Sequence, residues 1–383
     1  MPAIQTKRAI ALIDANNFYC KCECVFNSFL IGKPVGVASN NDGCVVARSE
    51  ELKALGVKMG EPVFKMKQLI KQYGIIILSS NYPLYADMSN RLMSILSMFS
   101  PDQEIYSIDE SFLDLTAFQS RNLVEYGQQM RERIIKWIGL PVCVGIGSTK
   151  TLAKLANHCA KKRPQFNGVC NFNDMHAAEL DALLNDVHVS EIWGVGRKLA
   201  PRLEAMGYRT VLDLKRANSA ALRQQFSVVM QKTIHELNDI VCIELEDVTP
   251  PKKQILSSRS FGHPVTDYNS LAESITMYVS RAAEKLRKQQ SFAGSIYVYI
   301  RTSPFRPDDP FYSKGMTIPM PSPTDDTRQL VKVALWGLKQ IYKANFNYAK
   351  AGVMLSELVP SEGVQIDLFS QGQVSLKTDD CDG

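Results

Sequence analysis

The sequence has no hydrophobic run long enough to cross a membrane. Its longest apolar stretches, such as residues 75–78, fall far short of the roughly 20 residues that a spanning helix needs. Residues 1–8 are polar and lack the apolar segment of a secretory signal peptide. We therefore expect a protein without membrane contact that works in the cytoplasm.

The sequence also lacks the patterns of disulfide frameworks and zinc centres. Its nine cysteines are scattered and odd in number, which is typical of reduced intracellular thiols. Cys20, Cys22 and Cys24 fall on an expected helix, where neighbouring side chains are three or four residues apart rather than two. The five histidines pair at no ligand spacing, and no Ser/His/Asp arrangement is apparent. These absences disfavour zinc enzymes and hydrolases of the triad type.

What the sequence does contain is a basic body of ordinary globular composition. Its 383 residues suffice for about two to four domains, and 45% hydrophobic and 22% charged residues fit a soluble globular protein. The net charge is +5, but residues 360–383 hold five acids against one base, so residues 1–359 carry +9. That excess of positive charge favours a polyanionic partner such as nucleic acid.

Alternating strand and helix patterns predict an α/β layer up to about residue 172. The expected strands are 8–13, 34–38, 45–47, 75–78, 104–108, 111–115 and 142–146, and the expected helices are 18–26, 50–55, 62–73, 83–99, 121–138 and 150–161. Residues 173–240 are expected to be mostly helical. Residues 242–253 contain Thr249-Pro250-Pro251 and are expected to form a linker. A separate α+β domain follows, with a strand at 295–302 and helices at 271–288 and 328–342.

Three carboxylates stand out because each lies at the expected end of a strand. Asp14 follows the strand 8–13, and Asp109 and Glu110 form the turn between two later strands. Neighbouring strands of one sheet can bring such residues together, and carboxylate oxygens are ligands for Mg²⁺. Two cations about 3.5–4 Å apart need bridging carboxylates, as in nucleotidyl transfer. From spacing alone, solvated turn acids remain the alternative.

An aromatic pair, Phe18-Tyr19, follows Asp14 within five residues. A ring this close to a metal-bound nucleotide would pack against the sugar and exclude a 2′-hydroxyl group. Packing in the core of a helix is the alternative interpretation of the same pair.

Residues 145–151 combine a strand end, a small-residue turn and a helix start. They are not a P-loop, because Val144 and Thr149 stand where that motif requires glycine. Backbone amides at a helix start still favour anions. Lys150 and Lys154, four residues apart on the helix, are expected to point at one anion, with a solvated helix face as the alternative.

A second glycine turn, Trp193-Gly194-Val195-Gly196, is followed by Arg197 and Lys198 between expected helices. This pattern predicts a helix-hairpin-helix element, whose glycine amides hold a DNA phosphate without reading sequence. Leu199 replaces the third glycine of a dinucleotide-binding fingerprint, so that motif is absent.

The last domain holds nine basic residues between Lys252 and Arg306. Arg259 and Arg301 fall in expected strands, where they predict a basic sheet surface along the backbone of a duplex. The cluster at 281–288 is expected to be a solvated helix face.

Seven stretches, taken in order, resemble the Y-family DNA polymerases. They are 14–19 (DANNFY), 39–44 (SNNDGC), 54–60 (ALGVKMG), 85–89 (YADMS), 106–110 (YSIDE), 150–156 (KTLAKLA) and 193–196 (WGVG). SNNDGC, together with SRSFG at 258–262, is similar to the UmuC-type branch, that of the catalytic subunit of bacterial DNA polymerase V. The resemblance covers about residues 8–370.

The resemblance implies a right-hand polymerase made of α/β and α+β domains. The implied parts are a palm with a ferredoxin-like sheet (8–25 and 79–172), fingers (26–78), a helical thumb with the helix-hairpin-helix (173–241), a linker (242–253), an α+β little finger (254–359) and a tail with a clamp-binding motif (360–383).

The resemblance also implies the site residues. Asp14, Asp109 and Glu110 would be catalytic and, with the Ala15 carbonyl, would bind two Mg²⁺ ions. Tyr19 would be the steric gate against ribonucleotides. The implied nucleotide-binding residues are Asn17, Phe18, Tyr19, Arg48, Lys53 and Lys154, and the implied DNA-binding residues are Gly194, Gly196, Arg197, Lys198, Arg259 and Arg301.

The implied partners are primer-template DNA, dNTPs and a sliding clamp, with a UmuD-type dimer and a recombinase filament as further expectations. The clamp would hold Gln365, Ile366, Leu368 and Phe369. The expected function is error-prone translesion DNA synthesis during the DNA damage (SOS) response. Two alternatives remain open. A non-catalytic DNA-binding relative is disfavoured because all three acids are present, and a palm-fold nucleotidyl cyclase would not need the glycine turn or the basic last domain.

Overall fold

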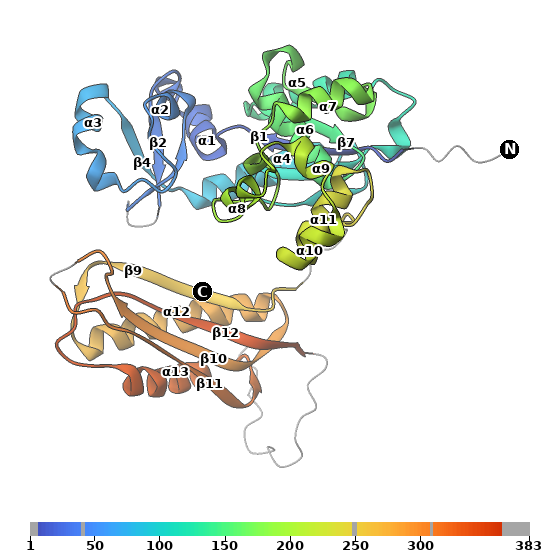
Figure 1. The fold of residues 1–383 in the computed structure, drawn as a ribbon. Coiled ribbons are helices and arrows are strands. Elements are labelled where there is room, and N and C mark those ends of the chain that lie inside the picture. The colour runs from blue at the N-terminus through green and yellow to red at the C-terminus, as the bar shows by residue number, and fades with distance from the viewer. Residues whose placement is uncertain (1–6, 40–42, 247–250, 307–308, 362–383) are drawn as a thin grey trace. The chain divides into compact units, whose positions relative to one another are not determined.

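The computed structural model describes residues 7–39, 43–246, 251–306 and 309–361 (Figure 1). The chain divides into two compact units, residues 1–249 and residues 250–383, called unit 1 and unit 2 below. Among the described residues, no helix is long and apolar enough to cross a membrane.

Unit 1 is built around a five-stranded sheet with the strand order β5-β6-β1-β7-β8. Its strands are β1 Ile10–Ala15, β5 Gln103–Ile105, β6 Glu110–Asp114, β7 Val142–Gly147 and β8 Val169–Asn171. The central strand β1 runs antiparallel to both neighbours, whereas β7 and β8 are parallel. The expected hairpin around the acidic pair is confirmed as β5 and β6.

Helices cover both faces of this sheet (Figure 1). Helices α4 Tyr82–Leu96 and α5 Leu123–Ile138 pack on the face that carries Ala11 and Ile13 of β1. Helix α6 Lys150–Lys162 packs on the opposite face. Because side chains alternate along a strand, Asp14 lies on the α6 face, together with Glu110 of the neighbouring strand.

A smaller sheet in unit 1, with the order β3-β2-β4, follows helix α1 along the chain. The elements of this part are α1 Phe18–Phe26, a 3₁₀ turn Ser28–Leu30, β2 Val35–Ala38, β3 Val45–Arg48, α2 Glu50–Ala54, a 3₁₀ turn Val63–Met66, α3 Lys67–Tyr73 and β4 Ile76–Ser79. The helix expected over 62–73 is therefore split into a 3₁₀ turn and an α-helix.

Five short helices complete unit 1 and share one core with the outer side of α6. They are α7 Ala177–Asn185, α8 Ala200–Ala205, α9 Val211–Lys215, α10 Ser219–Gln225 and α11 Val228–Leu237, with a 3₁₀ turn at Val189–Glu191. Three further 3₁₀ turns of unit 1 follow β6, α6 and β8, at Thr116–Phe118, Pro164–Phe166 and Phe172–Asp174. The mostly helical character expected for 173–240 is confirmed.

Unit 2 is a four-stranded antiparallel sheet in the order β11-β10-β12-β9. Its elements are β9 Ile255–Val265, α12 Tyr268–Lys288, β10 Ser291–Thr302, β11 Ser313–Thr324, α13 Thr327–Ile341 and β12 Tyr348–Pro360. Both helices pack on one face of the sheet. Strand β11 was not predicted from the sequence. It carries three prolines and is an edge strand of the sheet. Proline lacks a backbone N–H, and this loss is tolerated on the side of an edge strand that has no neighbouring strand.

Candidate active site

The backbone of unit 1 gathers the three acids at one edge of the large sheet. Asp14, near the end of β1, is directly opposite Glu110, the first residue of β6. One residue further along, the Ala15 N–H donates to the Asp109 carbonyl at 2.9 Å. Two strands that lie almost a hundred residues apart in the sequence therefore bring the expected carboxylates side by side.

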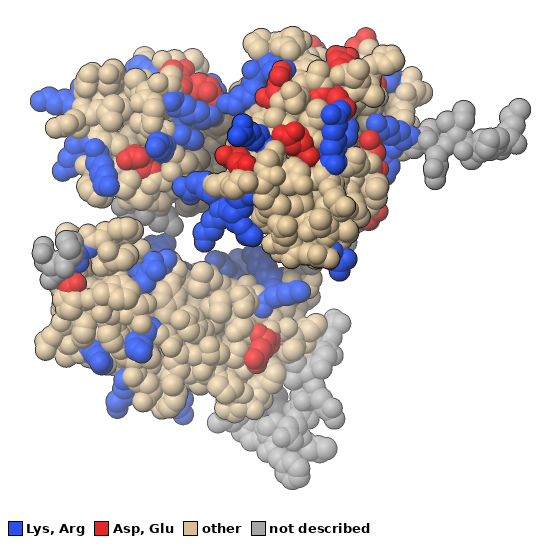
Figure 2. Space-filling view, in the orientation of Figure 1, with Lys and Arg blue, Asp and Glu red and all other residues tan. Residues whose placement is uncertain are grey.

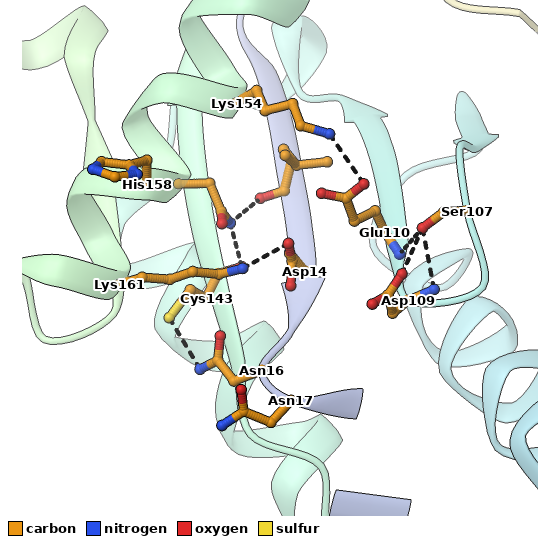
Figure 3. Close-up of polar contacts among 12 residues, drawn as sticks. Asp14, Asn16, Asn17, Ser107, Asp109, Glu110, Cys143, Lys154, His158 and Lys161 are labelled. Carbon is orange, nitrogen blue, oxygen red and sulfur yellow. Dashed lines mark hydrogen bonds and ion pairs between the residues drawn. The ribbon is translucent and has the colours of Figure 1, made fainter. Parts of the chain in front are cut away.

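Each of the three carboxylates has a partner within the protein (Figure 3). Lys161 Nζ lies 2.6 Å from Asp14 Oδ2, and Lys154 Nζ lies 3.0 Å from Glu110 Oε2. The Ser107 hydroxyl donates to Asp109 Oδ1 at 2.7 Å. Within the described residues, no group of three or more His, Cys, Asp or Glu side chains is arranged as a metal-binding cluster. The side chains thus face lysines and a serine, although the backbone holds them together.

Burial makes the negative charge on Asp14 costly. The pKa of Asp14 is raised to about 7, because desolvation by burial, reinforced by the neighbouring Glu110, outweighs the opposing effect of the Lys161 ammonium group. A carboxylate of this kind is stabilised by any cation that approaches it. The donor set, three carboxylates beside a strand-end carbonyl, consists of the oxygen ligands that Mg²⁺ prefers. In donor chemistry the site therefore fits divalent cations.

Lys161 was not among the residues expected from the sequence. It lies two helical turns beyond Lys154, so both ammonium groups project from the same face of α6 toward the acids. That seven-residue spacing was the available signal. The Nζ atom of Lys154 also lies over the rings of Tyr106 and Trp193, at 4.5 and 5.4 Å from their centroids. These contacts fix Lys154 beside Glu110.

The structure contradicts the expectation that Lys150 and Lys154 point at one anion. The Lys150 side chain is buried, and its Nζ contacts Glu104 Oε2 at 2.5 Å and the Glu244 carbonyl at 3.1 Å. The start of α6 is also closed, because the Thr151 N–H donates to a carboxylate oxygen of Glu236 at 3.0 Å. A buried ammonium group needs a paired acid, so Lys150 serves packing within unit 1.

Tyr19 lies beside the acids at the start of α1. Its ring stacks on Tyr85 with a centroid distance of 4.3 Å and an interplanar angle of 14°. Burial, together with the nearby Tyr82 and Asp109, raises the pKa of Tyr19. Phe18, its neighbour, is only 3% exposed and belongs to the core. Of the aromatic pair, only Tyr19 is therefore partly open.

Asn17, which follows β1, forms side-chain hydrogen bonds with two residues of α2. Its backbone adopts a left-handed conformation with φ 52°, which asparagine tolerates better than most residues. Its amide donates to Glu50 Oε1 at 2.8 Å and accepts from Lys53 Nζ. Arg48, in contrast, donates to the Val57 carbonyl at 2.6 Å. Lys53, but not Arg48, therefore contacts the turn that precedes Tyr19.

The second glycine turn is open to solvent. Gly194, Gly196, Arg197 and Lys198 are all exposed, while Val195 between them is buried and anchors the turn. Gly194 has φ +87°, a backbone conformation that L side chains rarely adopt. The exposed surface around this turn is therefore accessible to a large partner.

In unit 2, Arg259 and Arg301 do not share a surface. Arg301 is paired with Lys350, on the open face of the sheet. Arg259 is paired with Ala351, whose side chain is buried under the helices, so Arg259 emerges at the edge of the helix-covered face. The expectation that these two arginines form one basic sheet surface is therefore wrong. Their partners on β12, Lys350 and Ala351, are adjacent residues whose side chains point to opposite faces. Figure 2 shows lysine and arginine side chains at separate places on the visible face of unit 2.

Two sequence expectations lie outside the described residues. These are the clamp-binding residues Gln365, Ile366, Leu368 and Phe369, and the middle of the 39–44 motif.

The chain is similar to known proteins along almost its whole length. Residues 13–158 match the impB/mucB/samB family. Residues 252–368 match the C-terminal domain of that family, and residues 177–208 match its helix-hairpin-helix (HHH) motif. The last of these matches agrees with the element expected around the second glycine turn.

Individual relatives show the same likeness. Protein UmuC of Salmonella typhimurium is 44% identical over 94% of this chain and 85% of that protein. DNA polymerase IV of Bacillus velezensis is 27% identical over 95% and 86%. Among solved structures, a Y-family DNA polymerase chimera of Dbh and Dpo4 has a TM-score of 0.74 at 24% identity, covering 92% of this chain and 99% of that chain.

Proposed function

The chain belongs to the impB/mucB/samB family, the UmuC-type branch of the Y-family translesion DNA polymerases, and from this membership we propose how its residues carry out error-prone DNA synthesis. The fold is the expected Y-family polymerase fold. The observation that supports the proposal most is the pairing of β1 with β6, which gathers Asp14, Asp109 and Glu110 at one sheet edge between two lysines.

We assign the catalytic role to Asp14, Asp109 and Glu110, and with the Ala15 carbonyl they would hold two Mg²⁺ ions. Such ions supply activation of the primer 3′-hydroxyl and neutralise the pyrophosphate leaving group. The chain's own contribution is rigid placement, because the acids sit on paired strands. Lys161 and Lys154 add two ammonium groups that attract the triphosphate of a dNTP to the same edge.

The remaining nucleotide contacts are proposed for the segment around α1. Asn17 and Lys53, which touch each other, would orient the sugar and phosphates. Lys53 is favoured over Arg48 because the Arg48 guanidinium donates to the Val57 carbonyl in the loop after α2. The partly exposed Tyr19 ring would exclude the 2′-hydroxyl of a ribonucleotide. Phe18 would contribute only through its backbone, since its ring is in the core.

Primer-template DNA would be held by the open glycine turn, where exposed N–H groups and the side chains of Arg197 and Lys198 suit phosphates. Arg259 and Arg301 would contact DNA separately, from different faces of unit 2. A UmuD-type dimer and a recombinase filament are proposed as further partners, and the cytoplasm as the location where all of these meet.

Asp109→Asn tests the catalytic proposal in a primer-extension assay with Mg²⁺ and dNTPs. We expect nucleotide addition to fall by roughly a thousandfold, because metal-assisted activation is worth several kcal/mol. DNA affinity should stay within about twofold, since binding rests on other groups. Asp114→Asn is the matched control, because Asp114 ends the strand that follows Asp109 and pairs with Arg8 instead.

Retention of more than a few per cent of extension by the Asp109 variant removes Asp109 from the mechanism. If the wild-type protein binds primer-template DNA but adds no nucleotide under any of these conditions, a non-catalytic DNA-binding role is favoured instead.

The tail assignment needs its own test. The apolar residues Ile366, Leu368 and Phe369 follow Gln365 in an otherwise polar and acidic stretch, which suits a partner pocket. Changing Leu368 and Phe369 to Ala should leave single-nucleotide insertion intact and abolish stimulation by a sliding clamp, because a tether acts through local concentration. Stimulation equal to wild type contradicts the motif, and a lower Tm favours docking of the tail on its own chain.

A further inference from the structure

Tyr19 is held in place by residues outside its own helix. Its ring stacks nearly parallel on Tyr85 of α4, and Tyr82 meets both rings edge-on, at centroid distances of 6.1 and 6.2 Å with interplanar angles of 89° and 81°. Stacked and edge-to-face geometries are the favourable arrangements of aromatic pairs. The three rings therefore form one packed cluster.

Tyr85 is the fully buried ring of this cluster. Its hydroxyl donates to Glu23 Oε1 at 2.7 Å. Glu23 lies four residues after Tyr19 on α1, so both residues project from the same side of that helix. Tyr85 therefore contacts α1 at two points: its ring stacks on Tyr19 and its hydroxyl donates to Glu23.

These contacts matter because a steric gate excludes a 2′-hydroxyl only if the gate ring keeps its position. A tyrosine at the first turn of a helix has more than one accessible rotamer. A ring free to rotate would move away from a 2′-hydroxyl at little energetic cost, whereas a ring stacked on an immobile neighbour would not. The part-buried hydrogen bond to the Glu23 carboxylate helps to hold Tyr85 in place.

We infer that Tyr85, anchored by Glu23, is a positioning residue that determines sugar selectivity by fixing the ring of Tyr19. This inference rests on the proposed role of Tyr19 as the gate. Tyr85 is buried beneath Tyr19 and acts through it.

The test compares kcat/KM for a dNTP and the matching rNTP in single-nucleotide insertion by the full chain. Tyr85→Leu should raise the rNTP-to-dNTP ratio about tenfold, the size of one lost aromatic contact, while dNTP insertion falls no more than about threefold. Tyr85→Phe keeps the stack and loses only the hydroxyl, so it should raise the ratio by about threefold at most. Glu23→Gln keeps an acceptor and should stay near wild type.

Tyr126→Leu is the matched control. Tyr126 is also buried, stacks on Phe118 at 5.6 Å, and donates its hydroxyl to the Phe99 carbonyl at 2.8 Å. Its loss should lower thermal stability to a similar extent without changing the sugar ratio. A purely structural role for Tyr85 predicts that both leucine variants behave alike.

Tyr19→Ala and the double variant Tyr19→Ala/Tyr85→Leu separate this inference from the gate itself. Tyr19→Ala should open the site to rNTPs, and adding Tyr85→Leu should then change the ratio no further. If Tyr19→Ala discriminates as wild type, the gate role and this inference both fall. If Tyr19→Ala opens the site but Tyr85→Leu does not, only the role of Tyr85 is overturned. Should Tyr85→Leu fail to fold, Glu23→Ala removes the acceptor that anchors Tyr85 and is expected to raise the rNTP-to-dNTP ratio. A wild-type ratio in Glu23→Ala then overturns the role of Tyr85.

Discussion

The two glycine turns of unit 1 have similar sequences and opposite surroundings. Both place glycines just before a helix that starts near two basic residues. In the turn after β7, the four residues from Ser148 to Thr151 are at most 3% exposed. In the turn before α8, Gly194, Gly196, Arg197 and Lys198 are exposed. The same pattern, a glycine turn before a helix, is thus buried in the core in one place and exposed to solvent in the other.

The difference comes from what packs on each helix start. At α6, Glu236 of α11 accepts the Thr151 N–H and also the N–H groups of Cys242 and Ile243. The glycines of β7 are needed because α6 lies against the strand backbone: a Cβ at Gly145 would come within 2.0 Å of Asn157 N. At Gly196, no atom lies within 4 Å of an added Cβ. Glycine serves close approach in the first turn and accessibility in the second.

Gly145→Ala is expected to have the largest effect on stability. The new methyl group would meet the backbone of α6, at Asn157 N and at 2.3 Å from the Ala153 carbonyl, so we expect a loss of about 3 kcal/mol or more in the free energy of unfolding. Urea denaturation followed by circular dichroism measures it. Gly196→Ala is the matched control, expected to change the free energy of unfolding by less than about 0.5 kcal/mol. Equal effects of the two substitutions would show that α6 can accommodate a side chain at Gly145.

Glu236→Ala should be the next most damaging change. It leaves three backbone N–H groups without their acceptor, which we expect to cost about 2–3 kcal/mol of unfolding free energy. Glu236→Gln keeps one acceptor oxygen and should cost less. DNA affinity, measured by fluorescence anisotropy at a temperature where each variant is folded, should not change. A large loss of affinity in a folded variant would mean that this turn, too, contacts DNA.

Substitutions in the exposed turn before α8 should change DNA affinity rather than thermal stability. Changing Arg197 and Lys198 together to Ala should weaken DNA binding about tenfold near 0.1 M salt and reduce the slope of log K against log salt by about 2. Thermal stability should not move, because both side chains are exposed. Arg91→Ala, which removes an exposed arginine elsewhere, is the control. A salt slope unchanged from wild type would exclude phosphate contacts at this turn.

The smallest expected effect separates the two glycines of the open turn. Gly194 has φ +87°, so Gly194→Ala should cost about 1 kcal/mol of unfolding free energy through backbone strain. The same change at Gly196 carries no positive φ and should cost less. The Tm difference between the two variants measures this strain, and identical Tm values would show that the turn relaxes without penalty.

Much of the candidate site was predictable because it depends on local patterns. The apolar run before Asp14 predicts a buried strand, and the strand–turn–strand pattern around Asp109 and Glu110 predicts a hairpin. Strand β11 escaped prediction because its three prolines are unfavourable in most strands and are tolerated only at an edge. Whether a strand is an edge depends on its neighbours, which lie elsewhere in the sequence.

The order of most elements, the motifs of the family and the placement of the acids at strand ends could be predicted from local patterns in the sequence. These follow from periodicity and chain order, which are local properties. The ion pairs, in contrast, depend on the tertiary fold: Lys161 with Asp14, Lys154 with Glu110, and Lys150 buried against Glu104. The tertiary fold also decided that Arg259 and Arg301 lie on opposite faces and that Tyr85 underlies Tyr19. Such pairings depend on strand register and on the packing of segments far apart in the sequence, and a one-residue change of register moves a side chain to the other face.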